Sequence, residues 1–334
     1  MTLDTAISGR SNAVKKWAPA VGVVRKPLFI AGVAMMGILV AGEIVAPGFA
    51  APEQIIKMLV VAALLGIVAA GQNLVILGGK EGIDLSVGAT ITLGALIAGN
   101  VMQGQDSMIA IALIATLAVT FGVGLLNGIG VTVLRIPPLV MPLGMLGVLH
   151  GSLILLTRGR PSGNSAEMLS NLVDDPLIFG LPGILIVWIG LGILVTLLLR
   201  RTLFGMRIYA IGTNETAARL SGVPVGITRT LLFGLSGMFA GLAGFFILGF
   251  TGNVFLGVGD QYMLPAIIAV VFGGTSLAGG RGGYVGTMAG AVVLTLLQSL
   301  LTTLHIDPSG RQIIFGATLL LLMLFYGRQQ RLRS

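Results

Sequence analysis

Long apolar runs follow one another through almost the whole of this sequence, and they constrain the fold more than any other feature. A helix needs about 20 apolar residues to cross the hydrocarbon of a bilayer. Only 10% of the residues are charged and 55% are hydrophobic, with a mean hydropathy of +1.00. So few charges cannot cover the surface of a water-soluble domain. The sequence therefore predicts an all-α polytopic membrane protein.

About ten of the runs are expected to cross the membrane. The predicted spans are approximately 28–46, 58–78, 85–103, 107–134, 138–157, 182–199, 230–251, 262–275, 284–304 and 311–327. Charges between the runs test this count, because cytoplasmic connections carry an excess of Lys and Arg. With ten spans, the arginine-rich connection 200–229 and the basic end of the chain both lie inside, whereas nine or eleven spans would place one of them outside. Both termini are therefore predicted to be cytoplasmic.

The polar parts of the chain complete its organisation and exclude some functions. Residues 1–27 form a basic N-terminal segment, 28–327 a transmembrane domain, and 328–334 a basic tail. The apolar run from Leu28 is long enough to span, so it is expected to be a retained helix and not a cleaved signal peptide. The net charge of +8 does not indicate nucleic-acid binding, because the basic residues cluster in short connections beside apolar runs. Without cysteine, no disulfide or thiolate metal site is expected.

The connection 200–229 is the longest polar insert. It contains one acid, Glu215, and five arginines: Arg200, Arg201, Arg207, Arg219 and Arg229. Asn214 to Ser221 is predicted to be a short helix, with Asn214 as its N-cap and Gly222 and Pro224 at its end. A short capped helix between long apolar segments is the shape expected of an element that docks onto a cytoplasmic partner.

Two glycine-rich stretches interrupt the apolar pattern: GGKEGIDLSVG at 78–88 and GGTSLAGGRGGYVG at 273–286. Each stretch begins with a glycine pair and leads into VGAT or VGT, which hints at an internal repeat with both copies in the same orientation. Non-helical backbone at membrane depth must be packed in protein or line a watery cavity. Both stretches are therefore predicted to be broken or re-entrant. Neither has the GxxxxGK[ST] spacing of a phosphate-binding loop, so an ATPase would have to be another chain.

Polar side chains inside apolar spans are costly and tend to face a cavity or a partner helix. The candidates for a solute path are Gln72, Asn73, Asp84, Ser86, Asn127 and Thr275. Hydrogen bonding between helices is at least as good an explanation for each of them. Asp84 either accepts hydrogen bonds from solute hydroxyls or caps its own helix. His150 is interpreted as a histidine bonded between helices and not as a proton relay.

Glycines four residues apart recur on three predicted helices. The pairs are Gly124 with Gly128, Gly237 with Gly241, and Gly286 with Gly290. Small residues at this spacing let helix backbones approach closely in lipid. Helix packing is the interpretation that we favour, and a direct role in conduction is the alternative.

Three segments together carry a family resemblance: LVILGGKEGIDLSVGA at 74–89, RTLFGMRIYAIGTNETAARLSGVPV at 201–225 and AIIAVVFGGTSLAGGRGGYVGT at 266–287. In order and spacing they resemble the signature regions of monosaccharide-type ABC importer permeases, the ribose, galactose, xylose and autoinducer-2 group of the bacterial inner membrane. The resemblance implies a permease subunit without an ATPase site, cofactor or metal of its own. It also implies the partners: ATPase subunits that bind ATP and Mg²⁺, a periplasmic solute-binding protein, a second permease subunit (the same chain or a paralogue) and membrane lipid.

In such permeases, the basic connection resembles a coupling element that docks in a groove of the ATPase. The residues that match it are Glu215, Ala217, Ala218 and Gly222, and the predicted coupling residues also include Asn214, Arg219 and Ser221. Glu215 and Arg219 are expected to make polar contacts with the ATPase, and the two alanines to pack closely against it. Lys80 and Glu81 depart from the shorter turn of the family, with an effect that the sequence does not predict.

Two other functions stay open. A permease of the same superfamily would carry a non-sugar solute such as a nucleoside, an amino acid or a signalling molecule. A stand-alone secondary transporter would need several acids within its spans, and few are present beyond Asp84 and Glu43. The sequence does not distinguish a homodimer from a heterodimer of permeases.

Overall fold

The computed structural model describes residues 21–79, 82–178 and 180–331, so the predicted roles of Lys80, Glu81 and most of the N-terminal segment lie outside the described residues. The elements are α1 (Val21–Val45), α2 (Pro52–Leu77), α3 (Val87–Met102), η3 (Asp106–Met108), α4 (Ile109–Thr132), α5 (Val140–Thr157), α6 (Glu167–Asp174), β1 (Pro176–Ile178), β2 (Leu181–Pro182), α7 (Gly183–Arg201), α8 (Leu203–Thr213), α9 (Glu215–Leu220), α10 (Val225–Thr251), α11 (Asp260–Phe272), α12 (Tyr284–Thr303) and α13 (Pro308–Arg331). The predicted helical membrane protein is confirmed.

Each predicted span coincides with a helix, although some ends differ. Among the described residues, seven helices are long and apolar enough to cross a membrane, and α3 and α11 are shorter apolar helices. α2 begins at Pro52, earlier than predicted, because proline fits the first turn of a helix and Glu53 lies in that turn. α10 likewise begins at Val225, directly after Pro224.

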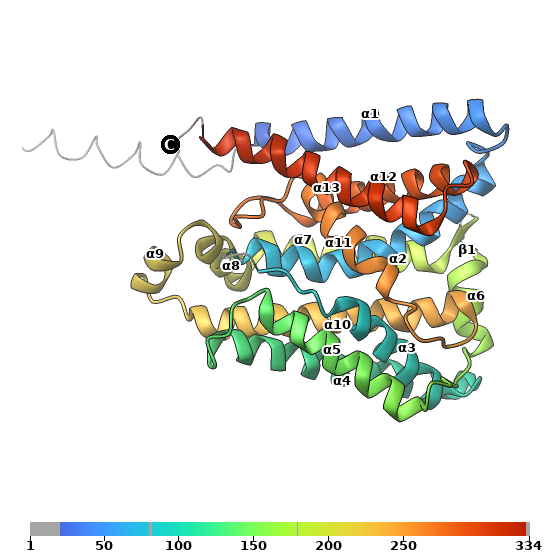
Figure 1. The fold of residues 1–334 in the computed structure, drawn as a ribbon, viewed down its shortest axis with the longest axis horizontal. Helices are drawn as coiled ribbons and strands as arrows, with labels where there is room; N and C mark the ends of the chain where they lie inside the picture. Colours follow the sequence, from blue (N-terminus) through green and yellow to red (C-terminus); the bar gives the residue numbers. More distant parts are fainter. Residues whose placement is uncertain (1–20, 80–81, 179, 332–334) are drawn as a thin grey trace, which may run out of the picture.

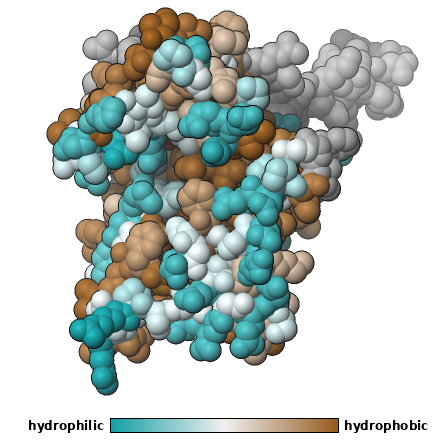
Figure 2. Space-filling view, turned by 90° about the vertical axis from the view of Figure 1, so that its right-hand side faces the viewer, coloured by the Kyte–Doolittle hydropathy of each residue, from teal (hydrophilic) through white to brown (hydrophobic). Residues whose placement is uncertain are grey.

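The long helices run roughly along one direction, and the polar elements lie at the two ends (Figure 1). α8 and α9 lie at one end, whereas α6 and β1 lie at the other. α10 is central and packs against α4, α3 and α2, while α1 packs on α12 at the outside. Hydrophilic residues cover much of the end that carries α6 (Figure 2). This arrangement leaves apolar helix sides exposed between two polar ends.

The exposed sides of the outer helices are strongly apolar. Phe29 on α1, Leu155 on α5 and Leu194 on α7 are 74%, 79% and 60% exposed. In water such surfaces would be unfavourable, whereas in a bilayer they contact lipid chains of similar polarity. The exposed apolar sides of the outer helices are therefore the surface that the predicted contact with membrane lipid requires.

The three glycine pairs all lie at helix contacts, as predicted. A Cβ added at Gly128 would lie 2.6 Å from the Cα of Thr230 on α10, and one at Gly237 would overlap the Thr120 carbonyl of α4. Gly290 on α12 similarly faces the Ala269 carbonyl of α11. Without side chains at these positions, the backbones approach closely enough for dispersion contacts to accumulate.

The connection between α5 and α7 has a structure that the sequence analysis did not predict. α6 buries Leu169 and Val173 against Gly249 near the end of α10. A short antiparallel hairpin follows, in which Ile178 pairs with Leu181. α6 has no side-chain cap and is only 8 residues long. Its packing on α10 therefore stabilises it, and no local signal marked it.

Candidate functional site

The predicted docking element is a pair of short helices, α8 and α9, and not a single helix on a loop. The Thr202 hydroxyl accepts a hydrogen bond from the Gly205 N–H at 3.1 Å and so caps α8. Asn214 Oδ1 accepts one from the Ala217 N–H at 3.0 Å and caps α9, as predicted. The left-handed Gly222, with a φ of 81°, ends the segment before α10. The N-cap residue Thr202 was the sequence signal for the start of α8, and the sequence analysis did not identify this helix.

Ala218 packs inside its own chain, which corrects the expectation that it contacts the ATPase. Its side chain is only 4% exposed and forms a small apolar cluster with Ile211 of α8 and Val225 of α10. The helical period explains this result, because Ala217 and Ala218 are adjacent and point about 100° apart on α9. Ala217 is exposed, whereas Ala218 attaches α9 to α8 and α10.

Glu215 also makes internal contacts that the sequence analysis did not predict. Its carboxylate pairs with Arg219 at 3.0 Å on α9 and with Arg229 at 3.0 Å on α10. The side chains of Glu215 and Arg229 are only 11% and 13% exposed, whereas that of Arg219 is 69% exposed. Glu215 therefore links α9 to α10, and Arg219 presents its charge outward.

The outward face of α9 mixes apolar and small residues. Leu220 is 85% exposed, and Ile227 on the first turns of α10 is 67% exposed. Ala217, Ser221 and Gly222 are exposed between them. An exposed leucine and isoleucine with small neighbours form a surface that another protein can cover by close packing.

The six candidates for a solute path are all buried and form two hydrogen-bonded groups. In the first group, Gln72 of α2 bonds the backbone of Asp84 on both sides, through its amide N–H group and its amide oxygen. Asp84 Oδ1 accepts from the Ser86 N–H at 3.0 Å and from the Ser86 hydroxyl at 2.6 Å. Asn127 of α4 donates to the Ser86 hydroxyl at 2.8 Å. Asp84 therefore holds the turn that precedes α3, whose N-cap Ser86 makes no side-chain cap hydrogen bond.

The second group lies on the other side of α2. The Asn73 amide donates to Thr275 at 2.9 Å and to Thr287 of α12 at 3.0 Å. Asn73 and Thr287 are fully buried, and Thr275 is 2% exposed. Gln72 and Asn73 are adjacent, so one turn of α2 bonds both glycine-rich stretches.

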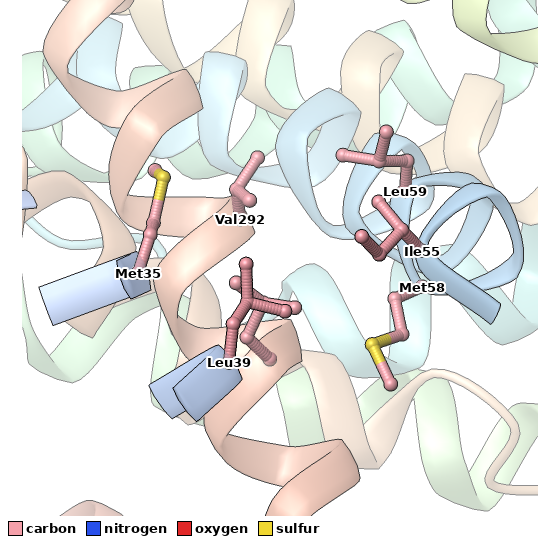
Figure 3. Close-up of a pocket in the computed structure, with 7 residues that line it drawn as sticks. Met35, Leu39, Ile55, Met58, Leu59 and Val292 are labelled. Carbon is pink, nitrogen blue, oxygen red and sulfur yellow. The ribbon is translucent and has the colours of Figure 1, made fainter. Parts of the chain in front are cut away.

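Neither polar group lines the cavity that the described residues form between α1, α2 and α12. This cavity has a volume of about 180 Å³, and its lining is wholly apolar. Met35 and Leu39 line it on α1, opposite Ile55, Met58 and Leu59 of α2 (Figure 3). It offers no donor or acceptor to a sugar. A polar solute would need the buried groups to separate before it could pass.

Two other ionisable groups of the helices, His150 and Glu43, have local partners. His150 of α5 lies 3.1 Å from Asp260 of α11, as the interpretation of a histidine bonded between helices requires. Glu43 accepts hydrogen bonds from the N–H groups of Gly48 and Ala50 and holds the turn between α1 and α2. Within the described residues, Asp84 is the one buried acid, and no cluster of three metal-ligating side chains is present.

These features define a polytopic helical membrane protein with buried polar groups at broken helices and a two-helix element at one end, as in a transport permease. The chain belongs to the family described as branched-chain amino acid transport system / permease component, which matches residues 54–323. No solved structure matches the chain.

The relatives cover nearly the full length of the chain. It is 33% identical over 305 residues to the ribose import permease protein RbsC of Bacillus subtilis, covering 91% of this chain and 93% of the relative. RbsC of Escherichia coli K12 is 32% identical over 338 residues, 99% and 100% of the two chains. The autoinducer 2 import system permease protein LsrC of Yersinia enterocolitica is 35% identical over 268 residues, 80% of this chain and 73% of the relative. The predicted membership of the monosaccharide-type permease group is confirmed.

Proposed function

We propose that this permease carries a monosaccharide or a related small polar solute across the bacterial inner membrane. In this proposal a periplasmic binding protein delivers the solute, and a separate ATPase supplies the energy with its own ATP and Mg²⁺. The observation that carries the proposal is the full-length similarity to ribose permeases. Among the described residues only one acid, Asp84, is buried, which supports it over a stand-alone transporter that would need a chain of buried acids.

The proposed topology has about ten spans, in which α3, α11 and α13 join the seven long helices. The α8–α9 end then faces the cytoplasm together with both termini, and the α6 end faces the periplasm. The chain has no native cysteine, so Ser221→Cys and Asp175→Cys report the two ends separately. We expect a membrane-impermeant maleimide to label residue 175 in intact spheroplasts and residue 221 only in inverted vesicles. The opposite labelling would reverse the topology.

The proposed ATPase contact is the outward face of α8 and α9, with Ala217, Arg219, Leu220, Ser221 and Gly222 in contact. Asn214, Glu215 and Ala218 contribute by holding α9 in place. Leu220→Asp is expected to abolish co-purification of the ATPase, because it places a charge where an apolar side chain would be covered. Leu177→Asp is the matched control, since Leu177 is 62% exposed at the opposite end. Equal co-purification by the two variants would remove α9 from the interface.

The substrate test is uptake by proteoliposomes that contain the permease, its ATPase and its binding protein. We expect ATP-dependent uptake of labelled ribose and no uptake of labelled leucine. The alternative is a non-sugar solute of the same superfamily, which the family description and the autoinducer-2 relative favour. Uptake of leucine or autoinducer-2 without ribose would establish that alternative. Masses of the detergent-solubilised complex would show whether the second permease subunit is this chain or a paralogue.

A further inference from the structure

Three segments that are far apart in the sequence meet at the end of α8 (Figure 1). They are the end of α2 at Leu77–Gly79, the end of α8 at Gly212–Thr213, and the α11–α12 connection at 278–280, which together we call the glycine junction. The Gly280 N–H donates to the Leu77 carbonyl at 3.0 Å across two of these segments. The junction therefore joins the docking element to both glycine-rich stretches.

The backbones at the glycine junction leave no room for a side chain. A methyl group at Gly212 would overlap the Leu77 carbonyl oxygen and the Gly280 nitrogen. Gly279 has a φ of 86°, and a Cβ there would lie 3.1 Å from the Cα of Gly212 and still closer to Gly79. In close-packed protein such contacts transmit displacement, because no void absorbs it. α8 cannot move toward α2 or the α11–α12 connection without displacing them.

A side chain makes a second attachment between α8 and the same connection. The Tyr209 hydroxyl donates to the Gly282 carbonyl at 2.9 Å. Burial raises the pKa of the Tyr209 phenol, and the charge of Arg200 partly opposes this shift. The phenol therefore keeps its proton, and hence its role as donor, at neutral pH.

The glycine junction is also close to the second buried polar group. Asn73 lies one helical turn before Leu77 on α2, and it bonds Thr275, which begins the α11–α12 connection. The same turn of α2 and the same connection are thus held together twice, once at the junction and once in the interior. Displacement at the junction acts directly on the pairing of Asn73 with Thr275.

We infer that Gly212 and Tyr209 are positioning residues that transmit movement of α8 and α9 to α2 and to the α11–α12 connection. This inference rests on the proposed coupling to an ATPase and adds the route of transmission. α7 and α10 are joined to the element through the chain and flank it. The glycine junction reaches α2 and the α11–α12 connection through direct contacts. ATP-driven movement of α8 then opens the buried polar groups from their cytoplasmic end.

The test compares Gly212→Ala with Gly226→Ala in proteoliposomes that contain the ATPase, the binding protein and labelled ribose. Gly226, on the first turn of α10, has nothing within 4 Å of an added Cβ, so it is the matched control. We expect Gly212→Ala to assemble with the ATPase and to hydrolyse ATP at the basal rate. Its uptake per ATP should fall about tenfold, within the range of typical coupling energies. Gly226→Ala should match the wild type.

Tyr209→Phe keeps the inference testable if Gly212→Ala fails to assemble. It removes one hydroxyl, and we expect uptake per ATP to fall by about fivefold, the usual effect of one hydrogen bond. A purely structural role would lower uptake and hydrolysis together and leave their ratio unchanged. An unchanged ratio in Tyr209→Phe, or in an assembled Gly212→Ala, overturns the inference while the proposed function stands. Absence of any ATP-dependent solute uptake in the wild type instead overturns the proposed function, and the inference with it.

Discussion

The two glycine-rich stretches resemble each other in sequence, but they are held in different ways. The described part of the first, at 82–88 before and into α3, is largely buried and is fastened by the side chains of Gln72, Asp84 and Ser86. The second, between α11 and α12, is partly exposed at 276–283 and is held largely through main-chain hydrogen bonds, such as that from the Ser276 N–H to the Arg281 carbonyl at 2.9 Å. We interpret the first stretch as fixed in the interior and the second stretch as able to move together with α8.

The largest effect that would sharpen this comparison is expected at Asp84. In Asp84→Ala, the N–H and hydroxyl of Ser86 lose their buried acceptor, which costs about 2–4 kcal/mol. The melting temperature of the purified protein should fall clearly. Asp175→Ala, at an exposed acid, should leave it unchanged. Equal melting temperatures for the two variants would show that the first stretch does not depend on its side chains.

A smaller difference is expected between the adjacent residues Gln72 and Asn73. Gln72→Ala leaves both the N–H and the carbonyl of Asp84 without their partner, at a cost of about 2 kcal/mol. Asn73→Ala leaves two threonine hydroxyl oxygens without the amide that donates to them, but each hydroxyl keeps its own O–H as a donor, so about 1 kcal/mol is expected. Thermal melting of both variants in one detergent measures the order. The reverse order would contradict the fixed character of the first stretch.

The smallest effect is expected for a matched pair of serines. Ser86→Ala removes a hydroxyl that bonds both Asp84 and Asn127 in the interior, at a cost of about 1–2 kcal/mol. Ser276→Ala removes one that accepts from the Ala278 N–H at 3.3 Å near the surface, and it should change stability by less than about 0.5 kcal/mol. Melting temperatures again give the comparison. A loss at Ser276 as large as that at Ser86 would mean that side chains hold both stretches.

Much of the fold was predictable because its signals are local. Apolar length identified the long helices, glycine spacing identified the helix contacts, and Asn214 with Gly222 marked α9. α8 was missed because its one signal is Thr202 within a basic stretch. α6 was missed because it is only 8 residues long and its stability depends on packing against α10 and α7. The buried polar residues of the helices were identified, but their hydrogen-bond partners were not, because those partners lie far away in the sequence.

The sequence by itself determined that this protein lies in a membrane, because a helix that crosses hydrocarbon must be long and apolar. It also marked the helix contacts, because small residues let helix backbones approach closely in lipid. It also determined the position of α9 through its Asn214 cap. Only the tertiary structure decided that Ala218 faces inward and that Gln72 and Asn73 bond different glycine-rich stretches. It also decided that Gly212 packs against both the end of α2 and the α11–α12 connection. Those outcomes depend on distances between segments up to about 200 residues apart, such as Asn73 and Thr275. Composition and spacing along the chain carry no record of such distances.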